Sequence, residues 1–118
     1  MLIERKRVIL VSFSTNSRKF KSLSERNKFF RDLYGWKQIV KKSDKRYCYE
    51  RDGLLDEFPH IKVDDSVFIT AERNLSEVEE YFNRWREKVE FRIMKFLLDE
   101  KKMLEQLKPK KEVNVKIE

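Results

Sequence analysis

One apolar run near the N-terminus decides what kind of fold the chain can form. Residues Arg7 to Thr15 contain the sequence VILVSFS, in which apolar and β-branched side chains follow one another without regular polar alternation. This pattern is typical of a strand that is buried on both faces. We therefore expect the run to be the first and central strand of a sheet, with other elements packed against it.

The first helical segment is expected to begin near Ser22 and to end at Gly35. Ser22 or Ser24 can act as the N-cap, and Gly35 occupies the place of a left-handed C-terminal residue. Roughly one face of this helix carries the apolar residues Leu23, Phe30, Leu33 and Tyr34.

The second helical segment is expected over residues 74–89, where Asn74 and Glu77 have the spacing of a capping box. The apolar residues that recur at steps of three and four are Leu75, Val78, Tyr81, Phe82, Trp85 and Val89. The opposite side of this segment is acidic, with Glu77, Glu79, Glu80, Glu87 and Glu90.

Four further segments have strand character. Trp36 to Lys42 and Arg46 to Arg51 are separated by three residues, which is hairpin spacing. Ile61 to Thr70 alternates apolar and polar side chains, and Phe91 to Leu98 is expected to return to the sheet. Residues 52–59 contain Gly and Pro and are expected to form a surface loop.

The order strand, helix, hairpin, strand, helix, strand predicts one α+β domain over residues 1–100, followed by a charged C-terminal extension over residues 101–118. The predicted architecture is a ferredoxin-like sandwich (β-α-β-β-β-α-β) with two helices on one face of a mainly antiparallel sheet. The alternative is a PUA-like small barrel with helices at its ends. It is kept because Lys62 to Ile69 (KVDDSVFI) is similar to the loop and strand of those domains.

The composition predicts a folded cytoplasmic protein. Of its 118 residues 40% are apolar and 13% aromatic, which is enough for a core. Cys48 is the only cysteine, as suits a reducing compartment, and no apolar run approaches the roughly 20 residues that span a bilayer. Charged residues make up 42% of the chain and are mostly Lys, Arg and Glu, which is typical of proteins from hot environments.

The charge is unevenly distributed along the chain. Through Arg51 there are 15 Lys and Arg residues against 5 Asp and Glu, whereas from Asp52 onward there are 13 against 16. A basic field on one part of a small domain is typical of proteins that bind a polyanion.

Two basic segments are candidate nucleic-acid-binding sites. The loop from Ser14 to Lys21 leads into a helix, where hydroxyls, cations and unpaired backbone N–H groups can hold a phosphate. In the predicted hairpin, aromatic rings alternate with cations, so bases can stack and phosphates can bind, although the same rings could be half-buried in a sheet. The predicted contacts are Arg18, Lys19, Lys21, Arg26, Lys41, Lys42, Lys45 and Arg46 for phosphates, and Trp36, Tyr47 and Tyr49 for bases.

An acidic segment gives the runner-up hypothesis. Carboxylates can hold a divalent metal that activates water for phosphodiester cleavage, with a histidine as proton carrier. The residues concerned are Asp52, Asp56, Glu57, His60, Asp64 and Asp65, and their spacing matches no defined metal motif. The plainer interpretation is that they are loop solubilisers and turn formers.

The layout resembles the small ferredoxin-fold proteins of the CRISPR adaptation complex. The resemblance covers roughly Arg7 to Leu98 and rests on VILVSFS, a basic helix ending at YGWKQ, and the SVFI strand with the helix and strand that follow it. It implies dimerisation through the sheets, and hence a homodimer. That family typically has an acidic residue at the end of its first strand, where this chain has Ser12, Ser14 and Thr15, so the resemblance does not carry nuclease activity to that position.

The leading prediction is therefore a cytoplasmic nucleic-acid-binding domain that catalyses no reaction, needs no cofactor and does not enter a membrane. RNA is favoured over DNA, because short aromatic sheets suit unstacked bases. The alternatives are a metal-dependent nuclease and a protein-interaction module that docks through Lys101 to Glu118.

Overall fold

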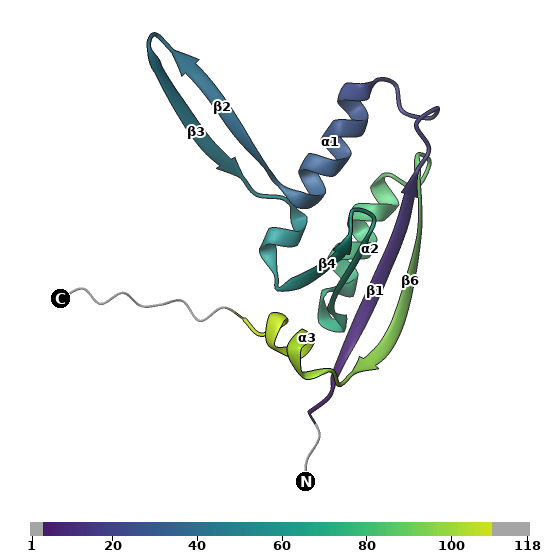
Figure 1. Cartoon of the computed structure of the whole chain (residues 1–118). Coiled ribbons are helices and arrows are strands. Elements are labelled where there is room, and N and C mark those ends of the chain that lie inside the picture. Colours follow the sequence, from purple (N-terminus) through teal and green to yellow (C-terminus); the bar gives the residue numbers. More distant parts are fainter. Residues whose placement is uncertain (1–3, 110–118) are drawn as a thin grey trace, which may run out of the picture.

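A four-stranded antiparallel sheet forms the body of the protein (Figure 1). The computed structural model describes residues 4–109. In spatial order the strands are β4 (His60–Asp64), β5 (Val67–Ala71), β1 (Lys6–Thr15) and β6 (Val89–Leu98). Two longer helices, α1 (Leu23–Tyr34) and α2 (Leu75–Arg84), pack on one face of this sheet. The predicted α+β class is confirmed, and β1 is a central strand because it pairs with both β5 and β6.

The face of the sheet under the two helices is aromatic. Ile9, Val11 and Phe13 of β1 point to this side and are buried together with side chains of α1 and α2. Phe82 of α2 lies at the middle of the cluster, with its ring centroid 5.2 to 6.2 Å from four phenylalanine rings. Those four rings belong to Phe13, Phe29, Phe68 and Phe91, which lie on β1, α1, β5 and β6.

A short helix, α3 (Lys101–Gln106), packs against the opposite face of the sheet. Its Leu104 and the following Leu107 are buried against Val8 of β1 and Leu98 of β6. Glu100 caps the helix, because its carboxylate accepts a hydrogen bond from the Met103 N–H at 2.8 Å. The core of the domain therefore continues past residue 100. The remaining part of the predicted extension, residues 110–118, lies outside the described residues.

The single strand predicted over residues 61–70 is two strands. β4 and β5 pair in antiparallel register around a turn at Asp65 and Ser66. The Asp64 carboxylate accepts the Asp65 N–H at 2.7 Å, and the Tyr34 hydroxyl donates to the Asp65 carbonyl at 2.5 Å. These bonds hold the turn, and the alternating pattern concealed it because the turn residues are themselves polar.

The second predicted helix is shorter than expected. It begins after a 3₁₀ turn, η2 (Glu72–Asn74), and ends at Arg84, while Val89 is already the first residue of β6. Asn74 makes no side-chain cap bond. Its amide instead donates to the Thr70 hydroxyl at 3.0 Å, and that hydroxyl donates to the Pro59 carbonyl at 2.8 Å. The predicted capping box is therefore wrong, because the Asn74 side chain forms a buried hydrogen bond with Thr70 instead.

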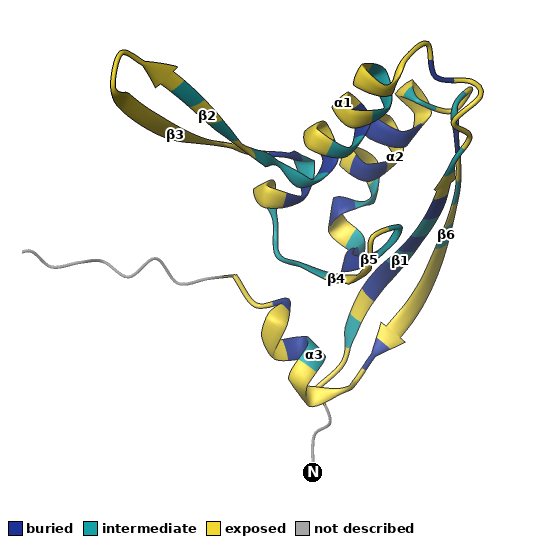
Figure 2. Cartoon of the chain, turned by 45° about the horizontal axis from the view of Figure 1, so that its top comes forward, coloured by how far each residue is buried: buried dark blue, intermediate teal, exposed yellow. Residues whose placement is uncertain are grey.

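The predicted hairpin exists, but it does not join the main sheet. β2 (Trp36–Lys42) and β3 (Lys45–Arg51) form a separate two-stranded sheet that projects from the body (Figures 1 and 2). We call residues 36–51 the arm. Every residue of β3 is exposed. The described strands of the main sheet remain open at β4 and β6, so they do not close into the PUA-like barrel considered as an alternative.

The two glycines of the chain meet at the root of the arm. Gly35 ends α1 with a φ of +84°, and Gly53 precedes the 3₁₀ turn η1 (Leu54–Glu57). A Cβ atom on Gly53 would lie 2.3 Å from the Gly35 nitrogen and 2.6 Å from the Leu33 carbonyl oxygen. The Gly53 N–H donates to the Asp56 carboxylate at 2.8 Å. The backbone thus enters and leaves the arm through one close contact that only glycine permits.

Gly53→Ala is expected to lower the free energy of unfolding by about 3 kcal/mol, because the new methyl group meets backbone atoms that cannot move aside. The matched control is Asp52→Ala at the neighbouring exposed position, which should change stability by less than about 0.5 kcal/mol. Urea unfolding of both variants measures the difference. Equal midpoints would contradict the close backbone contact.

Leu104→Ala is expected to cost about 2 to 4 kcal/mol, because the leucine is buried in the cluster that α3 forms with the sheet. The exposed neighbour Gln106→Ala provides the control and should leave stability nearly unchanged. Thermal unfolding followed by circular dichroism compares the two. A Leu104→Ala protein as stable as the control would show that α3 is not part of the folded domain.

Candidate nucleic-acid interface

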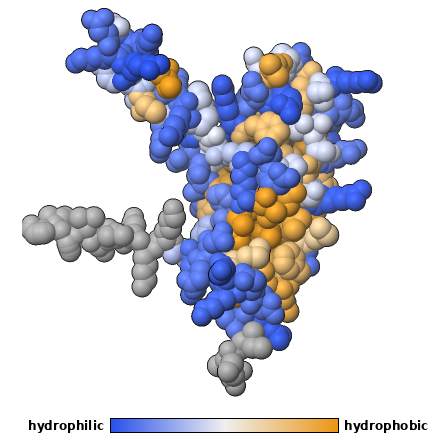
Figure 3. Space-filling view, viewed as in Figure 1, coloured by the Kyte–Doolittle hydropathy of each residue, from blue (hydrophilic) through white to orange (hydrophobic). Residues whose placement is uncertain are grey.

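The arm has two different faces. The register of β2 and β3 places Gln38 opposite Tyr49 and Val40 opposite Tyr47, so these four side chains share one face. Tyr47 is 41% exposed and Tyr49 45%, so both rings are accessible. The other face consists of Lys37, Ile39, Lys41, Arg46, Cys48 and Glu50. Hydrophilic residues cover most of the arm in the space-filling view (Figure 3).

The third predicted base contact, Trp36, lies at the root of the arm and is half-buried. The guanidinium of Arg31 on α1 is 4.2 Å from its ring centroid. This cation–π contact ties the first residue of the arm to the helix before it. Arg51, which faces Trp36 across the ribbon, is held by a 2.8 Å hydrogen bond to Gln38 and lies 5.4 Å from the Tyr49 ring. The predicted contacts did not include Arg31, Gln38 or Arg51.

Four predicted phosphate contacts meet at the tip of the arm. Lys42 faces Lys45, and Lys41 faces Arg46, on either side of the Ser43–Asp44 turn. All four are exposed, and among residues 4–109 none of them forms an ion pair. Like charges placed directly opposite each other destabilise a strand pair. The tip therefore concentrates positive charge at a cost to the hairpin.

The second basic segment, the loop after β1, lies away from the tip of the arm (Figure 1). An Asx turn shapes it, since the Asn16 side chain accepts the Arg18 N–H at 3.1 Å. The Asn16 N–H donates to the Lys88 carbonyl at 3.0 Å, which ties the loop to the turn before β6. Arg18 and Lys19 are exposed beside a cavity of about 450 Å³. Arg86 also lines this cavity, and it was not among the predicted contacts.

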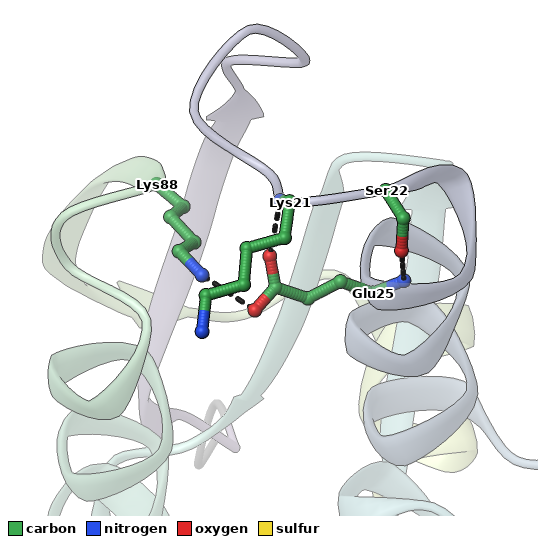
Figure 4. Close-up of polar contacts among 4 residues, drawn as sticks. All are labelled: Lys21, Ser22, Glu25 and Lys88. Carbon is green, nitrogen blue, oxygen red and sulfur yellow. Dashed lines mark hydrogen bonds and ion pairs between the residues drawn. The ribbon is translucent and has the colours of Figure 1, made fainter.

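The predicted phosphate-binding position at the start of α1 is occupied by the carboxylate of Glu25 (Figure 4). Ser22 caps the helix as expected, accepting the Glu25 N–H at 3.2 Å. The Glu25 carboxylate turns back and accepts the Lys21 N–H at 2.6 Å and a hydrogen bond from the Lys88 ammonium at 2.5 Å. Arg26 is half-buried, with its guanidinium 4.9 Å from the Phe30 ring centroid. The positive end of the helix is thus already neutralised by an internal anion.

The acidic residues of the nuclease hypothesis are engaged in local turns. Asp56 accepts the Gly53 N–H, Asp64 accepts the Asp65 N–H, and Lys62 pairs with Asp65 at 3.4 Å. The His60 ring nitrogen Nδ1 lies 3.1 Å from the Phe58 carbonyl oxygen. Within residues 4–109, no group of three or more acidic, histidine or cysteine side chains is assembled as a metal site. The predicted set Asp52, Asp56, Glu57, His60, Asp64 and Asp65 is therefore not brought together.

Comparison of the chain with protein-family models, with curated proteins and with solved structures finds no match. The resemblance to the CRISPR adaptation proteins stays a prediction. Among the helices of residues 4–109, none has the length and apolar character needed to cross a bilayer.

The ion pair of Glu25 generates a prediction about pH. The hydrogen bonds from Lys88 and from the Lys21 N–H hold the pKa of Glu25 below its usual value of 4.5. Folding therefore favours the ionised carboxylate, so its stabilising effect is complete above about pH 4.5 and is lost as the pH falls through the lowered folded pKa.

Glu25→Gln should lower the thermal midpoint at pH 7, and the gap to the parent protein should narrow toward pH 3, because the carboxylate takes up a proton as the pH falls through its lowered pKa. Glu79→Gln, at an exposed position on α2, is the control and should have little effect at either pH. Differential scanning calorimetry at the two pH values makes the measurement. A gap as wide at pH 3 as at pH 7 would mean that the carboxylate charge is not what stabilises this contact.

Proposed function

We propose that this protein is a nucleic-acid-binding protein and that the arm is its main binding element. The observation that carries the proposal is that two pairs of cations face each other at the tip. These pairs are Lys42 with Lys45 and Lys41 with Arg46. Repulsion between them weakens the isolated hairpin, and a phosphate backbone relieves that repulsion by neutralising the charges and releasing its own counterions. The arm has six Lys and Arg residues and only two acidic ones, Asp44 and Glu50.

The position of the acidic residues supports the same surface. Glu77, Glu79 and Glu80 are exposed on α2. In Figures 1 and 2, α1 lies between this helix and the arm. A polyanion bound to the arm would therefore be kept away from the carboxylates by the width of a helix. The loop cations Arg18 and Lys19, with Arg86, would supply secondary phosphate contacts.

The proposal extends to the architecture. We infer that the sheet and helices α1 and α2 form a ferredoxin-like unit, with the arm inserted between α1 and β4. A relation to the ferredoxin-fold CRISPR adaptation proteins, and the homodimer that it implies, are part of the same proposal. The preference for RNA expected from the aromatic residues also stays a prediction.

Replacing the tip cations in pairs should weaken binding and flatten its salt dependence. The unmodified protein should show a slope of log affinity against log salt that corresponds to roughly four or more phosphate contacts. Lys41→Ala with Lys42→Ala, or Lys45→Ala with Arg46→Ala, should each reduce that slope by about one to two, because each pair removes at least one cation that contacts a phosphate. Fluorescence anisotropy with labelled RNA and DNA, single- and double-stranded, measures both quantities.

The control is Lys101→Ala with Lys102→Ala, which removes the same charge from exposed positions on α3. Equal losses in this control and in the tip variants would place the binding surface elsewhere. Absence of binding to every probe at low salt would end the proposal and would turn attention to protein partners.

A further inference from the structure

We infer that the arm enters the major groove of double-helical DNA. The inference rests on the proposed nucleic-acid-binding function and specifies its ligand as DNA, in place of the RNA that the aromatic residues favour in the sequence analysis. It depends on the detachment of the arm from the sheet, on the chemistry of its outer face and on the way its root is fixed.

The dimensions of the arm suit one groove. Two paired strands lie about 4.8 Å apart, and seven residues extend over about 23 Å. The major groove of B-form DNA is about 12 Å wide and admits a two-stranded ribbon, whereas the minor groove is about half as wide. The major groove of A-form RNA is deep and narrow, so side chains on a ribbon cannot reach its base edges. Because β2 and β3 pair with no other described strand, both long sides of the arm are open.

The contact of Trp36 with Arg31 decides which face is presented. It turns the face that contains Trp36 toward α1 at the root, so at the root the opposite face, here called the outer face, points away from α1. On that outer face Lys41 and Arg46 lie side by side, two residue pairs beyond Ile39, which is 61% exposed. Arg and Lys donate to O6 and N7 of guanine, and apolar side chains contact the thymine methyl group. The outer face thus combines both kinds of group that read the major groove.

Lys42 and Lys45 belong to the other face, at the last residue pair before the turn. When the outer face meets the base edges, these two cations point away from the groove floor, toward the phosphates that border it. Phosphate contacts of this kind fix the position of a protein on DNA without reading its sequence.

The root makes the arm a fixed element. The contact between Gly35 and Gly53, together with the Arg31–Trp36 pair, sets the direction in which the ribbon leaves the body. A ribbon that is oriented before binding loses less conformational freedom in the complex, which favours affinity. The arm therefore differs from a basic tail that orders only on its ligand.

The alternative ligand, an unpaired strand whose bases stack on Tyr47 and Tyr49, would use the opposite face of the same arm. The two modes can be separated by matched double variants. Lys41→Ala with Arg46→Ala removes the cations of the outer face, and Tyr47→Ala with Tyr49→Ala removes the rings of the inner one.

The experiment measures the affinity of the full chain for a guanine-containing 20-base-pair DNA duplex, the RNA duplex of the same sequence and the separated strands, at fixed salt. In two further duplexes, 7-deazaguanine removes the N7 acceptor from the major groove, and inosine removes the amino group from the minor groove. We expect the DNA duplex to bind at least about fivefold more tightly than the other forms, and 7-deazaguanine to weaken binding about fivefold while inosine has no effect.

We also expect the Lys41→Ala, Arg46→Ala protein to lose its sensitivity to 7-deazaguanine, whereas the Tyr47→Ala, Tyr49→Ala protein keeps it. Tighter binding of single strands that depends on the two tyrosines would overturn the inference and leave the nucleic-acid-binding function standing. Sensitivity to inosine alone, or to neither base, would overturn the groove assignment. Loss of binding to every probe would remove the proposed function itself.

Discussion

The whole domain depends on the burial of β1 from both sides. The side chains of Ile9, Val11 and Phe13 pack under α1 and α2, while Val8 and Leu10 on the opposite face pack with the residues around α3. Both edges of the strand are also filled, by β5 and by β6. Because a buried backbone must satisfy its N–H and C=O groups, these two partners are required as much as the apolar packing is. No edge of β1 is left to take another strand.

This occupancy keeps β2 and β3 from pairing with β1, and they pair with neither edge strand of the sheet, β4 or β6. β2 and β3 follow α1 in the chain, where the sequence pattern expects the next strands of the sheet. The arm cannot pair with β1, and with β3 exposed along its whole length it has no buried face to place on the core. The sequence indicated that a hairpin would form over these residues, because strand residues and turn spacing are local signals. Its detachment depends on how the other strands pair and on the lack of a buried face along β3, and the pairing is set by residues spread over the whole chain.

Elsewhere too, features that depend on neighbouring residues were predicted correctly from the sequence, whereas contacts between distant segments were not. Ser22 and Gly35 mark the ends of α1 as predicted, since capping involves only neighbouring residues. α2 begins after Asn74 as predicted, but the predicted capping box was wrong because Asn74 bonds to Thr70, which is itself tied to Pro59 in a distant segment. At the candidate site, exposure of the tip cations followed from their local charge density. The binding of the Glu25 carboxylate at the start of α1 could not be predicted in this way, because its partner Lys88 is 63 residues away in the sequence.

Separation from the core gives the arm a freedom that a binding surface on the sheet would lack. If these facing cations lay in a sheet packed on α1 and α2, their repulsion would lower the stability of the whole domain. On a detached ribbon that repulsion acts on the hairpin alone, and the aromatic cluster around Phe82 is untouched. The arm and the body meet at the close contact between Gly35 and Gly53. This contact therefore sets the orientation of the ribbon relative to α1. Substitutions along the arm can therefore change its surface charge and shape without unfolding the body, whereas substitutions at its root affect folding and the direction of the arm together.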